Sequence, residues 1–265
     1  MKKVKLYVNS TKNNAWVVSE EVRKELIAAG YQVTDENPDI VIGFGGDGTF
    51  IKWISDNNYD TATRYIGINC GTLGFMQSFD ITDVKMFVEN IPNYIEEHLR
   101  YVKLTVNTGG KERVFYAVNE FNVLNAEDKT FRANVNIGFE FLETFVGTGL
   151  IFATPTGSTA RNISSVGSIM FPSIEAIQMT PIEAIVNSKI HCMPKSICIP
   201  SGTDILLTPA NDSSIKIIAD GINVFEGNYN SITISYSDRY MVTLSDRKNS
   251  FVKKIQKKTL NYMTH

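Results

Sequence analysis

The stretch Gly45-Gly46-Asp47-Gly48-Thr49 directly follows the apolar run DIVIGF at residues 39–44, and this junction decides the fold around it. A β-branched run that breaks into glycines predicts a buried strand ending in a tight turn, where the backbone can approach a phosphate without a Cβ in the way. A loop that only cradled phosphate would avoid a fixed negative charge, so Asp47 is predicted to be a general base, a metal ligand or both. The pattern favours phosphoryl transfer to a hydroxyl group.

Strand and helix patterns alternate on both sides of this loop. The expected elements are strands at residues 4–8, 40–44 and 65–68 and helices at residues 15–29, 49–55 and 84–90. A second glycine turn, NCGTLGF at residues 69–75, follows the third strand, and Thr82-Asp83 is the expected cap of the last helix. Such alternation predicts an open parallel sheet that binds ligands at the carboxyl ends of its strands, where both glycine turns lie.

From about residue 101 the pattern changes to short alternating runs separated by turn residues, which predicts a β-rich second domain. The expected strands are residues 102–106, 114–118, 133–137, 197–200, 205–207, 215–219, 231–236 and 241–244.

Composition narrows the function classes. The 265 residues are 43% hydrophobic with a net charge of −2, so the chain is globular and lacks the basic field of a nucleic-acid-binding protein. No apolar run is long enough for a membrane span and no signal peptide is visible, so no membrane partner is expected. Three cysteines without metal-type spacing fit a cytoplasmic protein. The basic run KKIQKK at residues 253–258 could bind a polyanion, but a solvated surface element is the favoured interpretation.

A second chemical landmark is the segment GTGLIFATPTGSTAR at residues 147–161. Its hydroxyls and backbone N–H groups suit phosphate or ribose oxygens, although a serine- and threonine-rich turn that opens a helix explains the composition equally well. The pair Asn119-Glu120 follows the run at residues 114–118. It could bind ribose hydroxyls, and taken alone it is better explained as a turn.

Together, the Asp47 loop, the Asn119-Glu120 pair and TPTGSTA at residues 154–160 resemble the NAD kinase family. GGDGT alone is shared with diacylglycerol and sphingosine kinases, but its combination with TPTGSTA at this separation is highly specific. The match also includes GTLGF at residues 71–75, FPS at residues 171–173 and TPI at residues 180–182.

The resemblance implies a fold of class α/β plus β. Residues 1–100 would form a Rossmann-like α/β domain that carries GGDGT, to which residues 251–265 return. Residues 101–250 would form a β-sandwich-like domain that binds NAD. The family assembles as dimers or tetramers in which a neighbouring subunit can complete the NAD site, so a homodimer or homotetramer is expected.

The implied reaction transfers a phosphoryl group from ATP or polyphosphate to the 2′-hydroxyl of the adenosine ribose of NAD, giving NADP. Asp47 would accept the hydroxyl proton. Mg²⁺ or another divalent metal would be bound through the donor phosphates, with Asp47 as a candidate ligand. The residues implied to bind donor or dinucleotide are Gly45, Gly46, Gly48, Thr49, Asn119, Glu120, Thr148, Thr156, Ser158, Thr159, Ala160, Arg161, Ser164, Glu183 and, near the donor or metal, Asp220.

Four positions depart from the family pattern, and one of them, Phe171 in place of a frequent histidine before Pro172, is expected to serve packing only. Thr148 stands where the family usually has an aspartate that faces NAD, Arg161 replaces a tyrosine that stacks on a base, and Glu183 replaces a small residue. One hypothesis is that Arg161 and Glu183 form a compensating ion pair, and the alternative is that Arg161 contacts a phosphate of an altered ligand. Besides an active NAD kinase, the sequence therefore leaves open a catalytically weakened dinucleotide-binding regulatory protein of the same fold and a kinase for another hydroxyl substrate.

Overall fold

The computed structural model describes residues 2–8, 13–70, 74–79, 83–212, 214–246, 250–256 and 258. The chain divides into two compact units, one of residues 1–99 and 239–265 and the other of residues 100–238. The chain end returns to the first unit at Arg239, earlier than residue 251. The reason is that residues 231–236 and 241–244, expected as two strands, belong to one continuous strand, β16 (Ser231–Ser245).

The first unit is built on a parallel sheet in the order β2-β1-β3-β4-β16. Its strands besides β16 are β1 (Lys3–Val8), β2 (Gln32–Val33), β3 (Ile40–Gly45) and β4 (Arg64–Asn69). Its helices are α1 (Asn13–Ala28), α2 (Asp47–Asp56), α3 (Val84–Asn90), the 3₁₀ turn η1 (Ile91–Asn93) and α5 (Phe251–Ile255). The expected strands and helices of this part are confirmed, and Asp83 caps α3 by accepting a hydrogen bond from the Met86 N–H at 2.9 Å. Thr82 lies outside the described residues.

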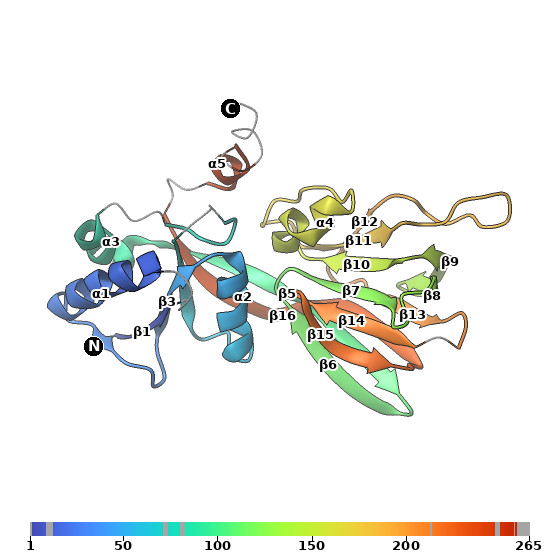
Figure 1. Cartoon of the computed structure of the whole chain (residues 1–265), viewed down its shortest axis with the longest axis horizontal. Helices are drawn as coiled ribbons and strands as arrows, with labels where there is room; N and C mark the ends of the chain where they lie inside the picture. Colours follow the sequence, from blue (N-terminus) through green and yellow to red (C-terminus); the bar gives the residue numbers. More distant parts are fainter. Residues whose placement is uncertain are drawn as a thin grey trace. The chain divides into compact units, whose positions relative to one another are not determined.

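Helices cover both faces of this sheet. Apolar residues of α1 and α3, such as Leu26 and Phe87, share one core with Ile42 on β3. The opposite face of β3 and β4 carries the paired glycines Gly43 and Gly67, and a Cβ on Gly43 would overlap the ring of Trp53 in α2. Figure 1 shows α1 and α2 on opposite sides of β3. The α/β prediction is therefore confirmed.

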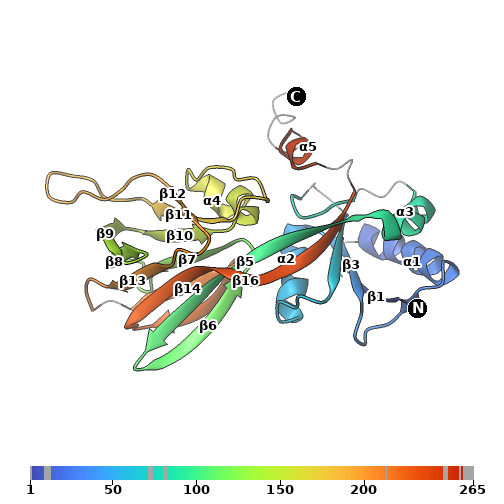
Figure 2. The same cartoon turned by 180° about the vertical axis from the view of Figure 1, so that it is seen from behind.

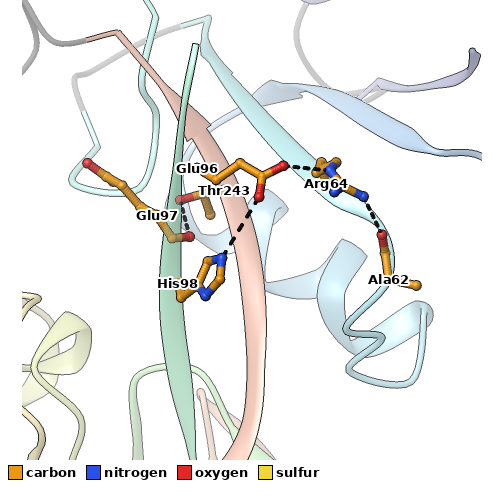
Figure 3. A network of polar contacts seen from close by, with 6 residues as sticks. All are labelled: Ala62, Arg64, Glu96, Glu97, His98 and Thr243. Atoms are coloured by element: carbon orange, nitrogen blue, oxygen red, sulfur yellow. Dashed lines mark hydrogen bonds and ion pairs between the residues drawn. The ribbon is translucent and has the colours of Figure 1, made fainter. Parts of the chain in front are cut away.

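A polar network ties the ends of two long strands to this sheet (Figure 3). Arg64, at the start of β4, donates Nε to Glu96 Oε1 at 2.8 Å on strand β5 (Ile95–Thr108). Thr243 Oγ1 on β16 donates to the Glu97 carbonyl at 3.4 Å. These bonds hold the first residues of β5 and the last residues of β16 within the first unit.

The second unit is a β-sandwich. One sheet has the order β12-β11-β10-β7-β14-β15, and the other contains β16-β13-β8-β9 with β5 and β6 (Figure 2). Phe121 and Phe152 from the first sheet and Phe131 and Ile232 from the second belong to a single buried core. The bounds are β6 (Lys111–Ala117), β7 (Glu120–Asn125), β8 (Phe131–Ile137), β9 (Glu140–Gly147), β10 (Gly149–Ala153), β11 (Ala176–Ile182), β12 (Ile197–Pro200), β13 (Ile205–Pro209), β14 (Ile215–Ala219) and β15 (Ile222–Gly227).

Strands β7, β9, β10, β11 and β15 were not expected from the sequence. All residues of β10 are buried, and so are nearly all of β7. A strand covered on both faces loses the alternation that marks a half-buried one. Within the part of the chain that the structure describes, no helix is both long and apolar enough to span a membrane.

Candidate active site

The GGDGT stretch forms the junction between β3 and α2. Strand β3 ends at Gly45, Gly46 is the N-cap, and Asp47 is the first helical residue. A carboxylate in the first turn interacts favourably with the helix dipole, which adds to the local stability of this arrangement. The predicted strand, turn and helix are all present.

The Asp47 carboxylate is held by the turn that follows the neighbouring strand. It accepts hydrogen bonds from the backbone N–H groups of Phe75 and Met76, both at 2.9 Å. Gly74 permits this approach, because a Cβ there would overlap the carboxylate. Strands β3 and β4 are parallel neighbours whose last residues, Gly45 and Asn69, pair directly. The two glycine turns therefore meet at one edge of the sheet; residues 71–73 lie outside the described residues.

Local packing requires glycine at one position of this loop and not at the other two. A Cβ on Gly45 would lie 2.7 Å from Thr49 Oγ1, so this glycine serves internal packing. Around Gly46 and Gly48 nothing described lies within 4 Å of an ideal Cβ, and neither glycine has a positive φ. Local packing and backbone geometry do not require glycine at these two positions. Their missing side chains instead leave the backbone N–H groups open to a close ligand.

Gly48→Ala is expected to stabilise the protein and impair its activity. Glycine inside a helix costs about 1 kcal/mol relative to alanine, and Gly48 lies in α2 with open space around it. The added methyl group would occupy the space proposed for the donor phosphates. Thermal unfolding should therefore shift upward while the KM for the phosphoryl donor rises. A stabilised variant with an unchanged donor KM would show that this space is not used.

In the second unit, Asp220 clamps the Asn119-Glu120 pair. Its carboxylate accepts backbone hydrogen bonds from Val118 at 2.7 Å, Asn119 at 2.7 Å and Glu120 at 3.2 Å. Asp220 and Gly221 have φ values of 48° and 86° and form the turn between β14 and β15. Consecutive residues with positive φ are typical of a type I′ hairpin, which Asp-Gly favours. The structure thus gives Asp220 a positioning role beside Asn119.

The TPTGSTA segment packs onto the same pair. Thr154 donates its backbone N–H to the Asn119 carbonyl at 2.8 Å and its hydroxyl to the Val118 carbonyl at 2.7 Å. A Cβ on Gly157 would overlap the Asn119 backbone, so only glycine allows this contact. The pair and the segment, 34 residues apart or more in the sequence, are therefore joined into one structure.

The remaining predicted residues of this segment have different environments. Ser158 is fully buried, donates its hydroxyl to the Pro155 carbonyl at 2.6 Å and accepts the Met170 N–H at 2.9 Å. Its hydroxyl is thus used inside the protein. Thr156 and Thr159 lie half-buried in the 3₁₀ turn η2 (Thr156–Thr159), and Ala160 follows it. Arg161 and Ser164 are exposed at the two ends of the short helix α4 (Arg161–Ser164).

Burial favours the neutral form of the Glu120 carboxyl. Burial, followed by the charge of Asp220, raises the pKa of Glu120 to about 8, against the opposing charge of Arg161. Burial raises the pKa of Asp220 only to about 6, because its backbone N–H donors favour the carboxylate form. Among the described residues, Glu120 Oε2 has no hydrogen-bond partner and is free to bind a ligand hydroxyl.

Asn122 was missed by the sequence analysis. It lies two residues after Glu120 on β7, is 1% exposed, and neither amide atom has a partner within the described chain. A buried amide without partners is costly unless a ligand or water satisfies it. The signal in the sequence was an asparagine between the buried apolar residues Phe121 and Val123.

Thr148 and Glu183 contact one another, and the ion pair between Arg161 and Glu183 is not formed. Thr148 Oγ1 donates to Glu183 Oε2 at 2.6 Å, beside a cavity of about 430 Å³. Strand β10 begins at Gly149, next to Thr148, and pairs with Glu120 only at its other end, Ala153. Within one chain, the strand length separates the Thr148–Glu183 pair from the Asn119-Glu120 group. The hypothesis of a compensating Arg161–Glu183 pair is therefore wrong within one chain.

The described residues contain no cluster of three or more His, Cys, Asp or Glu side chains suited to a metal ion. Asp47 is the one carboxylate in the glycine loop. This donor set fits Mg²⁺ in one of its usual protein environments, in which one or two carboxylates add to substrate phosphates and water.

Comparisons with known proteins agree on one family. The family model described as ATP-NAD kinase C-terminal domain matches residues 119–254. An NAD kinase of Mycoplasmoides gallisepticum is 32% identical, over 91% of this chain and 87% of its own length. Among solved structures, yeast NADH kinase complexed with NADH has a TM-score of 0.85 at 19% identity, covering 100% of this chain and 89% of its own. An NAD kinase from Archaeoglobus fulgidus in complex with ATP has a TM-score of 0.77 at 19% identity, covering 97% of this chain and 99% of its own.

Proposed function

This chain belongs to the NAD kinase family, and we propose that it transfers the terminal phosphoryl group of ATP or polyphosphate to the 2′-hydroxyl of the adenosine ribose of NAD. The observation that carries the proposal is the Asp47 loop. The Asp47 carboxylate is fixed by two backbone hydrogen bonds and stands between two glycines, Gly46 and Gly48. Both glycines have open space around them, and local packing does not require glycine at either position.

In the proposed mechanism, Asp47 accepts the proton of the 2′-hydroxyl as the phosphoryl group is transferred. That hydroxyl is a poor nucleophile near neutral pH, so a positioned base is useful. The N–H groups of Phe75 and Met76 fix the direction of the carboxylate. The backbone of the glycine loop binds the donor phosphates, and Thr49 adds a hydroxyl. Asp47 would hold Mg²⁺ together with the donor phosphates, and the bound ion would neutralise charge on the transferred group.

Asn119 and Glu120 are proposed to hold the ribose of NAD. A protonated Glu120 can donate and accept hydrogen bonds without adding negative charge beside the substrate's phosphates. Asp220 and the segment from Thr154 to Gly157 position this pair. Thr156, Thr159, Ala160, Arg161 and Ser164 are proposed to line the same site, where the guanidinium of Arg161 can stack on a base.

Thr148 and Glu183 support an oligomer. Because one chain keeps them apart from Asn119, we propose that this pair meets the dinucleotide bound by a second copy of the chain. The carboxylate of Glu183 then supplies the charge that the family's aspartate usually brings at position 148. Sedimentation equilibrium of the wild-type protein tests whether it is a homodimer or homotetramer.

The function is tested by incubating the pure protein with NAD, Mg²⁺ and either ATP or polyphosphate and measuring NADP. We expect NADP with at least one donor. NAD binding without turnover would favour a regulatory dinucleotide-binding protein, whose main support is the loss of the usual residues at Thr148 and Arg161. Neither binding nor turnover would favour a kinase for another hydroxyl substrate.

A further inference from the structure

Described residues of the C-terminal basic run and its preceding Phe251 contact Asp47 and the turn that binds it. The Phe251 ring on α5 lies 6.1 Å from the Phe75 ring, measured between centroids. Lys253 is exposed, Lys254 is 8% exposed, and the Lys258 side chain is 32% exposed. The interpretation of this run as a solvated surface element is therefore wrong for Lys254, which is buried, while Lys258 is partly exposed.

Lys254 is a buried cation bonded to a neutral group. Its Nζ donates to the Phe75 carbonyl at 2.8 Å, on the residue whose N–H binds Asp47. Burial lowers the pKa of Lys254, and the charges of Glu97 and Asp47 oppose this. No carboxylate among the described residues pairs with it directly. A buried ammonium group is costly, so its placement here indicates a need for positive charge close to Asp47.

Lys258 forms a partly exposed ion pair with Asp47. Its Nζ lies 3.6 Å from Asp47 Oδ2 and 4.5 Å from the centroid of the Phe75 ring. Partly exposed ion pairs of this kind contribute about 0–1 kcal/mol. A ligand with several negative charges near the glycine loop can therefore attract Lys258 away from Asp47 at little cost.

We propose that the C-terminal segment forms the cationic side of the phosphoryl-donor site, with Lys258 binding the donor's phosphates and Lys254 positioning the turn that holds Asp47. The ligand class is a linear polyphosphate chain, free or as part of a nucleoside triphosphate. The inference rests on the proposed function, because it places the donor at the Asp47 loop. In the protein without bound donor, Lys258 neutralises Asp47. When the donor binds, Lys258 moves to its phosphates and releases Asp47.

The first test compares Lys258→Ala with Lys253→Ala, which removes the same charge from an exposed position of the same segment. Loss of a charge-assisted hydrogen bond predicts a donor KM about 10-fold or more higher in Lys258→Ala, with the KM for NAD unchanged. Lys258→Arg should recover part of the loss. Equal donor KM values for Lys258→Ala and Lys253→Ala would overturn the proposal.

A second test measures the binding of inorganic tripolyphosphate in the absence of metal. Its outcome does not depend on the proposed reaction. Weaker binding by Lys258→Ala than by Lys253→Ala supports the cationic site, whether or not the wild-type protein makes NADP. A wild-type protein that makes no NADP would contradict the proposed function but not the cationic site. Equal binding by the two variants would overturn the site even in an active enzyme.

The positioning role of Lys254 is tested by Lys254→Met alone and combined with Asp47→Asn. If Lys254 acts through Asp47, Lys254→Met lowers kcat in the wild type and has little further effect in Asp47→Asn. Losses that multiply would contradict this role. Thermal unfolding checks that Lys254→Met is folded; if it is not, the partly exposed Lys258 decides the proposal.

Discussion

Asp47→Asn is expected to lower kcat by roughly 10²–10⁴-fold, the usual scale for a lost general base, and to leave NAD affinity largely unchanged. An amide nitrogen cannot accept the 2′-hydroxyl proton. The residues proposed to hold NAD belong to the other unit, which has its own core. Steady-state formation of NADP gives kcat, and titration of the variant with NAD gives the affinity.

The substitution also has a structural consequence that must be controlled. Both carboxylate oxygens of Asp47 accept backbone N–H groups, so the asparagine NH₂ would face one of these donors. One lost hydrogen bond costs about 1–3 kcal/mol, which thermal unfolding will detect. Asp56→Asn is a matched control, because it changes the same charge at the exposed end of the same helix. Near-normal turnover in Asp47→Asn would contradict the proposed role of Asp47.

The Asp47 loop could be predicted because its determinants are local. A buried apolar run, glycines and a helix start lie within about a dozen residues, and strand, turn and helix follow from their order. The same holds for Asp83, whose capping bond spans three residues. Short-range patterns of this kind are fixed by backbone stereochemistry and by the exposed groups of a helix end.

Contacts between distant parts of the sequence could not be predicted in this way. Lys254 is buried and bonded to the Phe75 carbonyl, and Thr148 is paired with Glu183 through the register of β10 with β11. The sequence shows four lysines at residues 253–258 and an apolar run at residues 149–153. No local pattern tells which of these lysines the fold will bury or which strand will pair with the run. The hypothesis of an Arg161–Glu183 pair failed for the same reason, because it depended on which ends of two antiparallel strands are adjacent.

Gly157→Ala is the other substitution with a large expected effect, here on kcat/KM for NAD. Its Cβ would overlap backbone atoms of Asn119, and a backbone cannot rotate away as a flexible side chain can. The Asn119-Glu120 pair must therefore move, together with the bonds from Thr154 and Asp220. A displacement of about 1 Å can cost 10²-fold in a positioned reaction, and we expect a loss of about this size in kcat/KM for NAD.

Strain from overpacking is also expected to destabilise the second unit by about 1–3 kcal/mol. Gly109→Ala supplies the comparison, since Gly109 has a φ of 57° with nothing within 4 Å of its Cβ. Alanine at position 109 costs about 1–2 kcal/mol because it must adopt the left-handed conformation. Gly109 lies at the turn of the hairpin of β5 and β6, far from Asn119. Both variants should unfold at lower temperature, but only Gly157→Ala should lower kcat/KM for NAD. Should Gly157→Ala fail to fold, Thr154→Val removes the hydroxyl that bonds Val118 and Gly157 and tests the same positioning. Normal kcat/KM for NAD in a folded Gly157→Ala would show that the packing of this segment on Asn119 does not position the substrate.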